Sequence, residues 1–176
     1  NSTEYIKSFV DFEKLRHPLI EHLNNDELYV TNCLSMGLDN TGLLLYGTNA
    51  VGKTSFIKSV GIAIVMAQSG MFVPASKFTY YPYTSLFTRI LGNDNIFKGL
   101  STFAVEMSEL RTIIYESDNR SLIIGDELCS GTESTSALSI FVASLEKLSK
   151  VPYLCETLRT RQRCSALSSL PTFRKT

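Results

Sequence analysis

The sequence predicts an α/β fold, in which a mostly parallel sheet packs against helices, from two observations. Two short apolar runs, Gly42–Tyr46 and Ser121–Asp126, have the continuous hydrophobic character of strands that are buried on both faces. Each run is followed by a segment with the apolar spacing of an amphipathic helix. Strands that alternate with helices favour parallel pairing, because each helix carries the chain back to the edge of the sheet where the strand began.

The remaining elements follow in order along the chain. A short apolar stretch with β-branched residues, Leu28–Leu34, precedes the first strand. The segment Phe72–Arg89, rich in aromatic and β-branched residues and interrupted by Pro74 and Pro82, predicts strand and loop pieces. A β core is favoured over nucleic-acid stacking for its aromatic set, because no basic residues are interleaved with Phe78, Tyr80, Tyr81, Tyr83 and Phe87. Three helices are expected, at Thr54–Ser69, Val105–Ser117 and Ser136–Leu148.

Composition and charge exclude several classes of protein. The 176 residues suit one domain, and 44% hydrophobic with 19% charged residues exclude a mainly disordered chain. The net charge is zero, which removes the simplest argument for a nucleic-acid-binding domain, a strong positive charge. The longest uncharged run, Ser59–Ser76, has too short an apolar part to cross a bilayer, so no membrane partner is expected.

The cysteines and the N-terminal residues favour an intracellular protein. The cysteines have neither CxxC spacing nor a histidine at ligand spacing, which argues against a metal or redox motif: Cys33, Cys129, Cys155 and Cys164. The segment Asn1–Glu13 is polar and mixed in charge, unlike a signal peptide. We therefore expect reduced thiols and an intracellular location, with the compartment left open.

The zero net charge conceals an asymmetry between the body of the chain and its tail. Residues 1–150 carry a net charge of −4, whereas residues 151–176 carry +4. The tail also loses the apolar periodicity of the preceding residues. We therefore place a domain boundary at residue 150 and expect a core that is incomplete at its C-terminal end. The basic tail after it is divergent, disordered or the product of a reading-frame change.

The strongest motif is a glycine-rich loop between the first strand and the helix after it. Residues 47–54 read GTNAVGKT and match the phosphate-loop pattern GxxxxGK[ST]. Glycines let backbone N–H groups converge on phosphate oxygens, and the helix N-terminus adds the positive end of its dipole. Lys53 is expected to reach the β- and γ-phosphates and Thr54 to bind Mg²⁺. The predicted phosphate-binding residues are Gly47, Thr48, Asn49, Ala50, Val51, Gly52, Lys53, Thr54 and Ser55.

An acidic pair follows the second buried strand, where a nucleotide-hydrolysing protein with a phosphate loop needs a carboxylate. Asp126 is expected to hold Mg²⁺ directly or through water, and Glu127 to orient or deprotonate the attacking water. The pair favours an ATPase of the ABC type over a nucleotide kinase, which has no water to activate. Two solvated carboxylates after a buried strand are the structural alternative.

Longer motifs surround these residues in a fixed order. They are Arg16–Glu21 (RHPLIE), Tyr46–Ser55, Met66–Ala75 (MAQSGMFVPA), Phe87–Ile90 (FTRI) with Ser101–Glu109 (STFAVEMSE), and Asp126–Thr132 (DELCSGT). Together they resemble the C-terminal ATPase domain of the MutS DNA mismatch-repair proteins over about Leu15–Lys150. The variants in Asp126–Glu133 and Gly92–Asn95 look more like the divergent branch found in octocoral mitochondria and large marine viruses.

The resemblance implies a P-loop NTPase core of the ABC type, built in three layers, with ATP and Mg²⁺ as cofactors. It also implies a homodimer or a family heterodimer in which each nucleotide lies between two subunits. Lys53, Thr54, Asp126 and Glu127 would act on the nucleotide of their own subunit. Ser101, at the start of a helix, would approach the γ-phosphate bound by the partner, and a helix N-cap is its alternative role.

The resemblance further implies a base-binding pair and a DNA partner. Tyr29 and Val30 align with positions that pack on adenine in the family, although Tyr29 also suits an ordinary half-buried strand. In the parent proteins, ATP binding is coupled to clamping on mismatched double-stranded DNA. The domains that read the mismatch lie N-terminal in the family and have no counterpart in this sequence.

Two departures from the family pattern concern the C-terminal part. Family members carry an aspartate shortly after the GT pair, at a subunit contact, where this chain reads Ser134-Thr135-Ser136. They also carry an ATH motif, whose histidine senses the γ-phosphate, after the strand that follows residue 150. This chain has no histidine after His22.

Three alternative functions stay open. The first is another ABC-type chromosome-maintenance ATPase, such as an SMC-like head, which needs an LSGG signature that the sequence lacks. The second is a phosphotransferase in which Asp126 binds Mg²⁺ and Glu127 is incidental. The third is a degenerate nucleotide-binding fragment that does not hydrolyse ATP.

Overall fold

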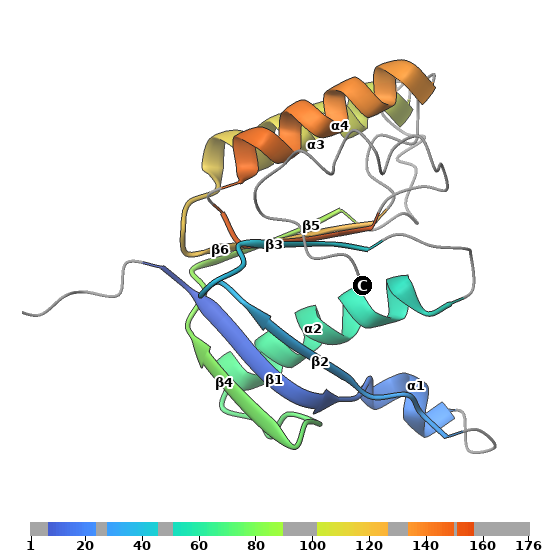
Figure 1. The fold of residues 1–176 in the computed structure, drawn as a ribbon, viewed down its shortest axis with the longest axis vertical. Coiled ribbons are helices and arrows are strands. Elements are labelled where there is room, and N and C mark those ends of the chain that lie inside the picture. Colours follow the sequence, from blue (N-terminus) through green and yellow to red (C-terminus); the bar gives the residue numbers. More distant parts are fainter. Residues whose placement is uncertain are drawn as a thin grey trace, which may run out of the picture.

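Two sheets with helices between and beside them make up the fold (Figure 1). The computed structural model describes residues 7–23, 28–45, 51–89, 102–126, 134–149 and 151–156. Within them, α3 (Thr102–Glu116) and α4 (Ser134–Leu148) cover one face of a parallel sheet. Helix α2 (Lys53–Gln68) and a small antiparallel sheet pack on its other face. No helix of these residues is long and apolar enough to cross a membrane.

The parallel sheet has the strand order β3-β7-β6-β5. Its strands are β3 (Gly42–Leu45), β7 (Tyr153–Glu156), β6 (Ser121–Gly125) and β5 (Ser85–Arg89). Because both faces are covered, alternate residues enter different cores: Leu122 and Ile124 pack with α2, whereas Ile123 packs with α3 and α4. This is why β3 and β6 have continuous apolar sequences, and both predicted buried strands are confirmed.

The three predicted helices are confirmed, with boundaries that move by up to three residues. In α2, Ile57, Val60 and Ile64 are buried at helical spacing, as expected. Gly61 lies on the same buried side, where a Cβ would come within 2.8 Å of Ile124 Cδ1. The glycine therefore permits a close approach between α2 and β6.

The antiparallel sheet was only partly foreseen. Its order is β2-β1-β4, with strands β1 (Phe9–Leu15), β2 (Asn32–Met36) and β4 (Lys77–Tyr81). Strand β1 was not predicted, although its sequence FVDFEKL alternates, and Val10 and Phe12 are fully buried. The short helix α1 (Pro18–Leu23) was not predicted either. The sheet adds a layer to the three that the predicted fold class implies.

Four of the five aromatic residues predicted to lie in a β core do so: Phe78, Tyr80 and Tyr83 in one cluster and Phe87 in the other. Tyr81 is in neither cluster, and Phe72, at the start of the segment, is 99% exposed. The rings of Phe78 and Phe12 stack with their centroids 6.0 Å apart, and Tyr83 is 5% exposed. The side-chain amide of Gln68, near the end of α2, makes two hydrogen bonds to the backbone of Tyr83. Nε2 of Gln68 donates to the Tyr83 carbonyl at 3.1 Å, and the Tyr83 N–H donates to Oε1 of Gln68 at 2.7 Å. The end of α2 is thus fixed to the segment that leads into β5.

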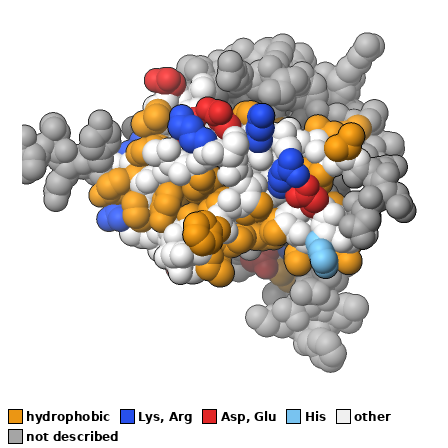
Figure 2. Space-filling model, turned by 90° about the horizontal axis from the view of Figure 1, so that it is seen from below, with side chains coloured by type: hydrophobic (Ala, Val, Ile, Leu, Met, Phe, Trp, Pro, Cys, Tyr) orange, Lys and Arg blue, Asp and Glu red, His pale blue; other side chains and the backbone are white. Residues whose placement is uncertain are grey.

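The face that includes the antiparallel sheet is mixed in charge (Figure 2). Basic and acidic side chains lie near one another there, among hydrophobic ones. Lys77 on β4, for example, lies 3.2 Å from Asp11 and 3.8 Å from Glu13 on β1. Such exposed pairs contribute little to stability, so the hydrophobic core beneath holds this sheet in place.

Strand β7 lies beyond residue 150, where sequence analysis placed the end of the domain. It pairs in parallel with β3 on one side and β6 on the other, in the interior of the sheet. Residues 151–155 are all buried. The ring of Tyr153 occupies the space above Gly42, where a Cβ would come within 2.1 Å of ring carbon Cζ. The sheet therefore includes the first residues of the tail, and residues 157–176 lie outside the described part of the chain.

Candidate functional site

The first turn of α2 directly follows the predicted glycine-rich loop. Gly52 has φ 87°, in the left-handed region that favours glycine, and nothing lies within 4 Å of the position a Cβ would take. Its carbonyl accepts the N–H of Phe56 at 2.9 Å, which starts the helical hydrogen bonding. No side chain of the described residues caps this helix end. The helix dipole favours an anion at such a terminus.

Thr54 and Asp126 meet although 72 residues separate them. Thr54 Oγ1 donates a hydrogen bond to Asp126 Oδ1 at 3.3 Å. Asp126 directly follows β6 and is 6% exposed, and its N–H donates to the carbonyl of Arg89 at 2.7 Å. A hydroxyl and a carboxylate oxygen held together in this way fit Mg²⁺, which takes one or two protein oxygens and completes its shell with water and phosphate.

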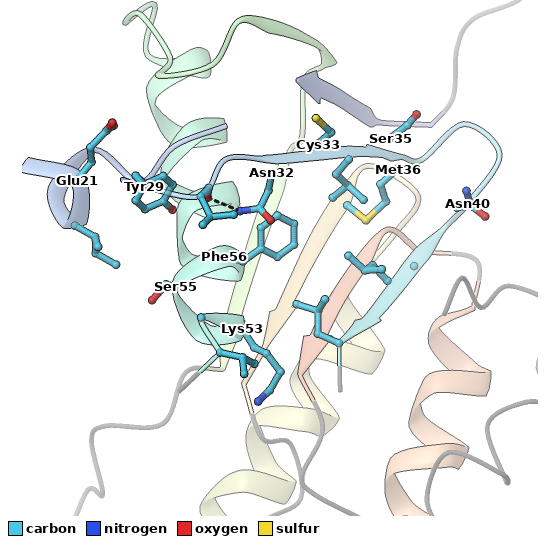
Figure 3. A pocket seen from close by; sticks show the side chains of 18 of the residues that line it. Glu21, Tyr29, Asn32, Cys33, Ser35, Met36, Asn40, Lys53, Ser55 and Phe56 are labelled. Atoms are coloured by element: carbon cyan, nitrogen blue, oxygen red, sulfur yellow. Dashed lines mark hydrogen bonds between the residues drawn. The ribbon is translucent and has the colours of Figure 1, made fainter. Parts of the chain in front are cut away.

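A cavity of about 660 Å³ extends from this helix start toward β2 and α1 (Figure 3). Its size suits a small-molecule ligand. Lys53 lies at one end, and Tyr29 lies near α1 at the other. Of the predicted binding residues, those that line it are Tyr29, Val30, Val51, Gly52, Lys53 and Ser55. Thr54 and Asp126 meet beside the cavity and are not among its lining residues.

The end of the cavity near Tyr29 has aromatic and apolar walls. Tyr29 is half-buried, whereas the side chain of Val30 is 79% exposed. Burial raises the pKa of the Tyr29 phenol, and the charge of Glu21 raises it further. The ring of Phe56 also lines the cavity, a role that the apolar spacing of the helix predicted at Thr54–Ser69 does not reveal.

Behind this end of the cavity, His17 holds the start of α1. Its side chain is 5% exposed, and Nδ1 accepts the N–H of Ile20 at 3.3 Å. Its carbonyl accepts the N–H of Glu21 at 3.1 Å. Burial lowers the pKa of His17, and the positive charge of Lys58 lowers it further. A neutral imidazole is therefore part of the support for Ile20 and Glu21, which both line the cavity.

Six of the predicted site residues lie outside the described residues. These are four positions of the glycine-rich loop together with the two residues expected to act on the γ-phosphate: Gly47, Thr48, Asn49, Ala50, Ser101 and Glu127. The three gaps that contain them are bounded by the described residues Leu45 and Val51, Arg89 and Thr102, and Asp126 and Ser134.

Comparison with known proteins connects this arrangement to one family. The model of the family MutS domain V matches residues 43–163, more than half of the chain and past the end of β7. A mitochondrial DNA mismatch repair protein mutS homolog of Sarcophyton glaucum is 38% identical to this chain, over 95% of the chain and 17% of that protein. The DNA mismatch repair protein MutS of Caldanaerobacter subterraneus is also 38% identical, over 82% of the chain and 17% of that protein.

A viral protein is similar to the same degree. The putative DNA mismatch repair protein mutS homolog of Acanthamoeba polyphaga mimivirus is 38% identical over 85% of the chain and 16% of that protein. Since the octocoral, viral and bacterial relatives share the same identity, the percentage does not separate the branches. The chain spans about a sixth of the length of these relatives.

Proposed function

The chain belongs to the MutS domain V family, and from this premise we propose that it is the ATP-binding and ATP-hydrolysing module of a DNA mismatch-repair protein. The observation that carries the proposal is the hydrogen bond between Thr54 and Asp126. It joins the helix that follows the glycine-rich loop to the end of β6, and so supports a site for a phosphate-bound cation.

Each residue of the proposed site has a role that follows from its chemistry. The Lys53 ammonium and the start of α2 bind the phosphates. Thr54 and Asp126 hold Mg²⁺, which, when bound, neutralises charge on the phosphate oxygens. Glu127 directly follows Asp126 and accepts a proton from the attacking water. Tyr29 stacks on the base, and Val30 lies at the cavity mouth.

The proposal extends to a dimer that acts on DNA inside the cell. Two chains, identical or from the same family, bind nucleotide between them, and Ser101 of each approaches the γ-phosphate held by the other. ATP binding there is coupled to clamping on mismatched double-stranded DNA by domains that lie outside this sequence. We also propose that the parent protein belongs to the octocoral and giant-virus branch, in keeping with two of its relatives.

A second candidate, a module that binds ATP without hydrolysing it, is favoured by one observation. The sequence has no histidine after His22, so the family's γ-phosphate sensor has no counterpart after β7. Binding needs only the phosphate loop, the base end of the cavity and the cation site, whereas turnover also needs the groups that act on the γ-phosphate.

Nucleotide binding and phosphate release by the 176-residue chain distinguish these candidates. We expect Lys53→Ala to weaken ATP binding at least about tenfold, because a charge-assisted contact is lost. We expect Glu127→Gln to retain ATP binding and to lower phosphate release at least about 100-fold, the usual contribution of a general base. Isothermal titration and a phosphate-release assay measure the two effects.

Lys58→Ala is the matched control, since Lys58 lies on the same helix but does not line the cavity. It is expected to bind ATP as the unaltered chain does. Binding without phosphate release in the unaltered chain would support the second candidate. Failure to bind ATP, with Lys53→Ala indistinguishable from the unaltered chain, would contradict both.

A further inference from the structure

Asn32 stands at the start of β2, at the end of the cavity away from Lys53 (Figure 3). Its Nδ2 donates a hydrogen bond to the carbonyl of Val30 at 3.3 Å. Because the Val30 carbonyl can only accept a hydrogen bond, the end of the Asn32 amide that faces it must be the NH₂ group. The amide oxygen is therefore left as an acceptor, on the side that Figure 3 shows toward the ring of Phe56.

The surroundings of this oxygen suit a flat heterocycle. Figure 3 shows the rings of Tyr29 and Phe56 on the side of the cavity near Asn32, and Leu34 also lines the cavity. The opposite end has Gly52 and Lys53 at the start of α2, where phosphates bind under the proposed function. A nucleotide with its phosphates at that end extends its base toward Asn32.

We propose that Asn32 selects the base, by accepting a hydrogen bond from the 6-amino group of adenine. The proposal rests on the proposed function and names a residue that sets its specificity. A base with a 6-oxo group would place one acceptor against another, and both oxygens would lose water without gaining a partner. Sites built around such a hydrogen bond reject analogues that lack it.

The two ends of the Asn32 amide have separate functions, and this separation makes the proposal testable. Asn32→Ala removes both the donor to Val30 and the proposed acceptor for the base. Asn32→Asp removes the donor and keeps an acceptor. If Asn32 only holds the Val30 carbonyl, the two variants should behave alike, whereas base selection predicts that they differ.

The experiment compares equilibrium binding of ATP with that of inosine triphosphate, whose base carries a 6-oxo group in place of the amino group. We expect the unaltered chain to bind ATP about tenfold more tightly, the effect of one hydrogen bond. We expect Asn32→Ala to reduce this ratio to within about twofold of unity and Asn32→Asp to keep most of it. Ser35→Ala, an exposed cavity-lining position on the same strand, is the matched control and should keep the ratio.

Thermal melting of each variant verifies that it is folded, and the ratio of the two affinities cancels any general loss of binding. An unaltered chain that binds both triphosphates equally would overturn base selection and leave the proposed function standing. Equal ratios for Asn32→Ala and Asn32→Asp would also overturn it. Binding of neither triphosphate would overturn the proposed function itself, and base selection with it.

Discussion

At the scale of single residues, the protonation state of His17 affects α1, which contributes Ile20 and Glu21 to the cavity wall. Its Nδ1 must be unprotonated to accept the N–H of Ile20, and burial with the charge of Lys58 lowers its pKa. In the unfolded chain a histidine has a pKa of about 6.5. As the pH falls through that value, the unfolded state binds a proton that the folded state does not, so the free energy of unfolding falls.

We therefore predict that the chain loses stability as the pH is lowered from about 7 through 6.5 and on to the lowered pKa of His17. Denaturant unfolding at a series of pH values measures the slope. His17→Asn, whose amide oxygen can also cap α1, should flatten it. His22→Asn alters an exposed residue at the end of the same helix and should leave the slope as it was. Equal slopes for His17→Asn and the unaltered chain would contradict the prediction.

Some site residues could be predicted from the sequence and others could not, for physical reasons. Local sequence patterns are enough to predict Lys53, Thr54 and Asp126 as candidates, because a glycine-rich loop before a helix and a carboxylate after a buried strand are both patterns of adjacent residues. Asn32 and Phe56 line the cavity only because β2 lies opposite the first turn of α2. The position of β2 opposite α2 depends on how the antiparallel sheet packs on the helix, and a local sequence pattern cannot predict this packing.

At the scale of elements, β7 shows how a short strand can escape sequence analysis. Its segment after residue 150 lacks an amphipathic period, because a central strand is buried on both faces and both of its neighbours are also strands. Tyr153 faces α3 and α4, whereas Leu154 faces α2. The positive charge that follows in the sequence belongs to residues beyond the strand, so the change in composition at residue 150 precedes the edge of the core.

We predict that Tyr153→Ala lowers the free energy of unfolding by about 3 kcal/mol, since it removes a fully buried aromatic ring. The matched control is Tyr115→Ala on α3, where the side chain is 77% exposed and the expected change is within about 0.5 kcal/mol. Chemical denaturation of both variants gives the comparison. A tail that takes no part in the core would make the two variants equally mild.

At the scale of the whole molecule, the parallel sheet brings together elements that are distant in sequence. The loop after β3 leads to Lys53 and Thr54, and Asp126 follows β6, with β7 between these two strands. Parallel strands end at the same edge, which is where open α/β sheets bind ligands. The neutral net charge of the chain is the sum of the acidic residues 1–150 and the basic residues 151–176. Because β7 pairs with β3, the folded sheet extends past residue 150 into the basic segment.

The dependence of ATP binding on Mg²⁺ tests the proposed cation site at Thr54 and Asp126 most directly. Titration of the unaltered chain should show affinity at least about tenfold higher with Mg²⁺ than with a chelator. Asp126→Asn should bind ATP with little dependence on Mg²⁺, because a carboxylate ligand is lost, while Asp118→Asn, at the other end of β6, should behave as the unaltered chain. An Asp126→Asn variant with the full response to Mg²⁺ would contradict the assignment of this site.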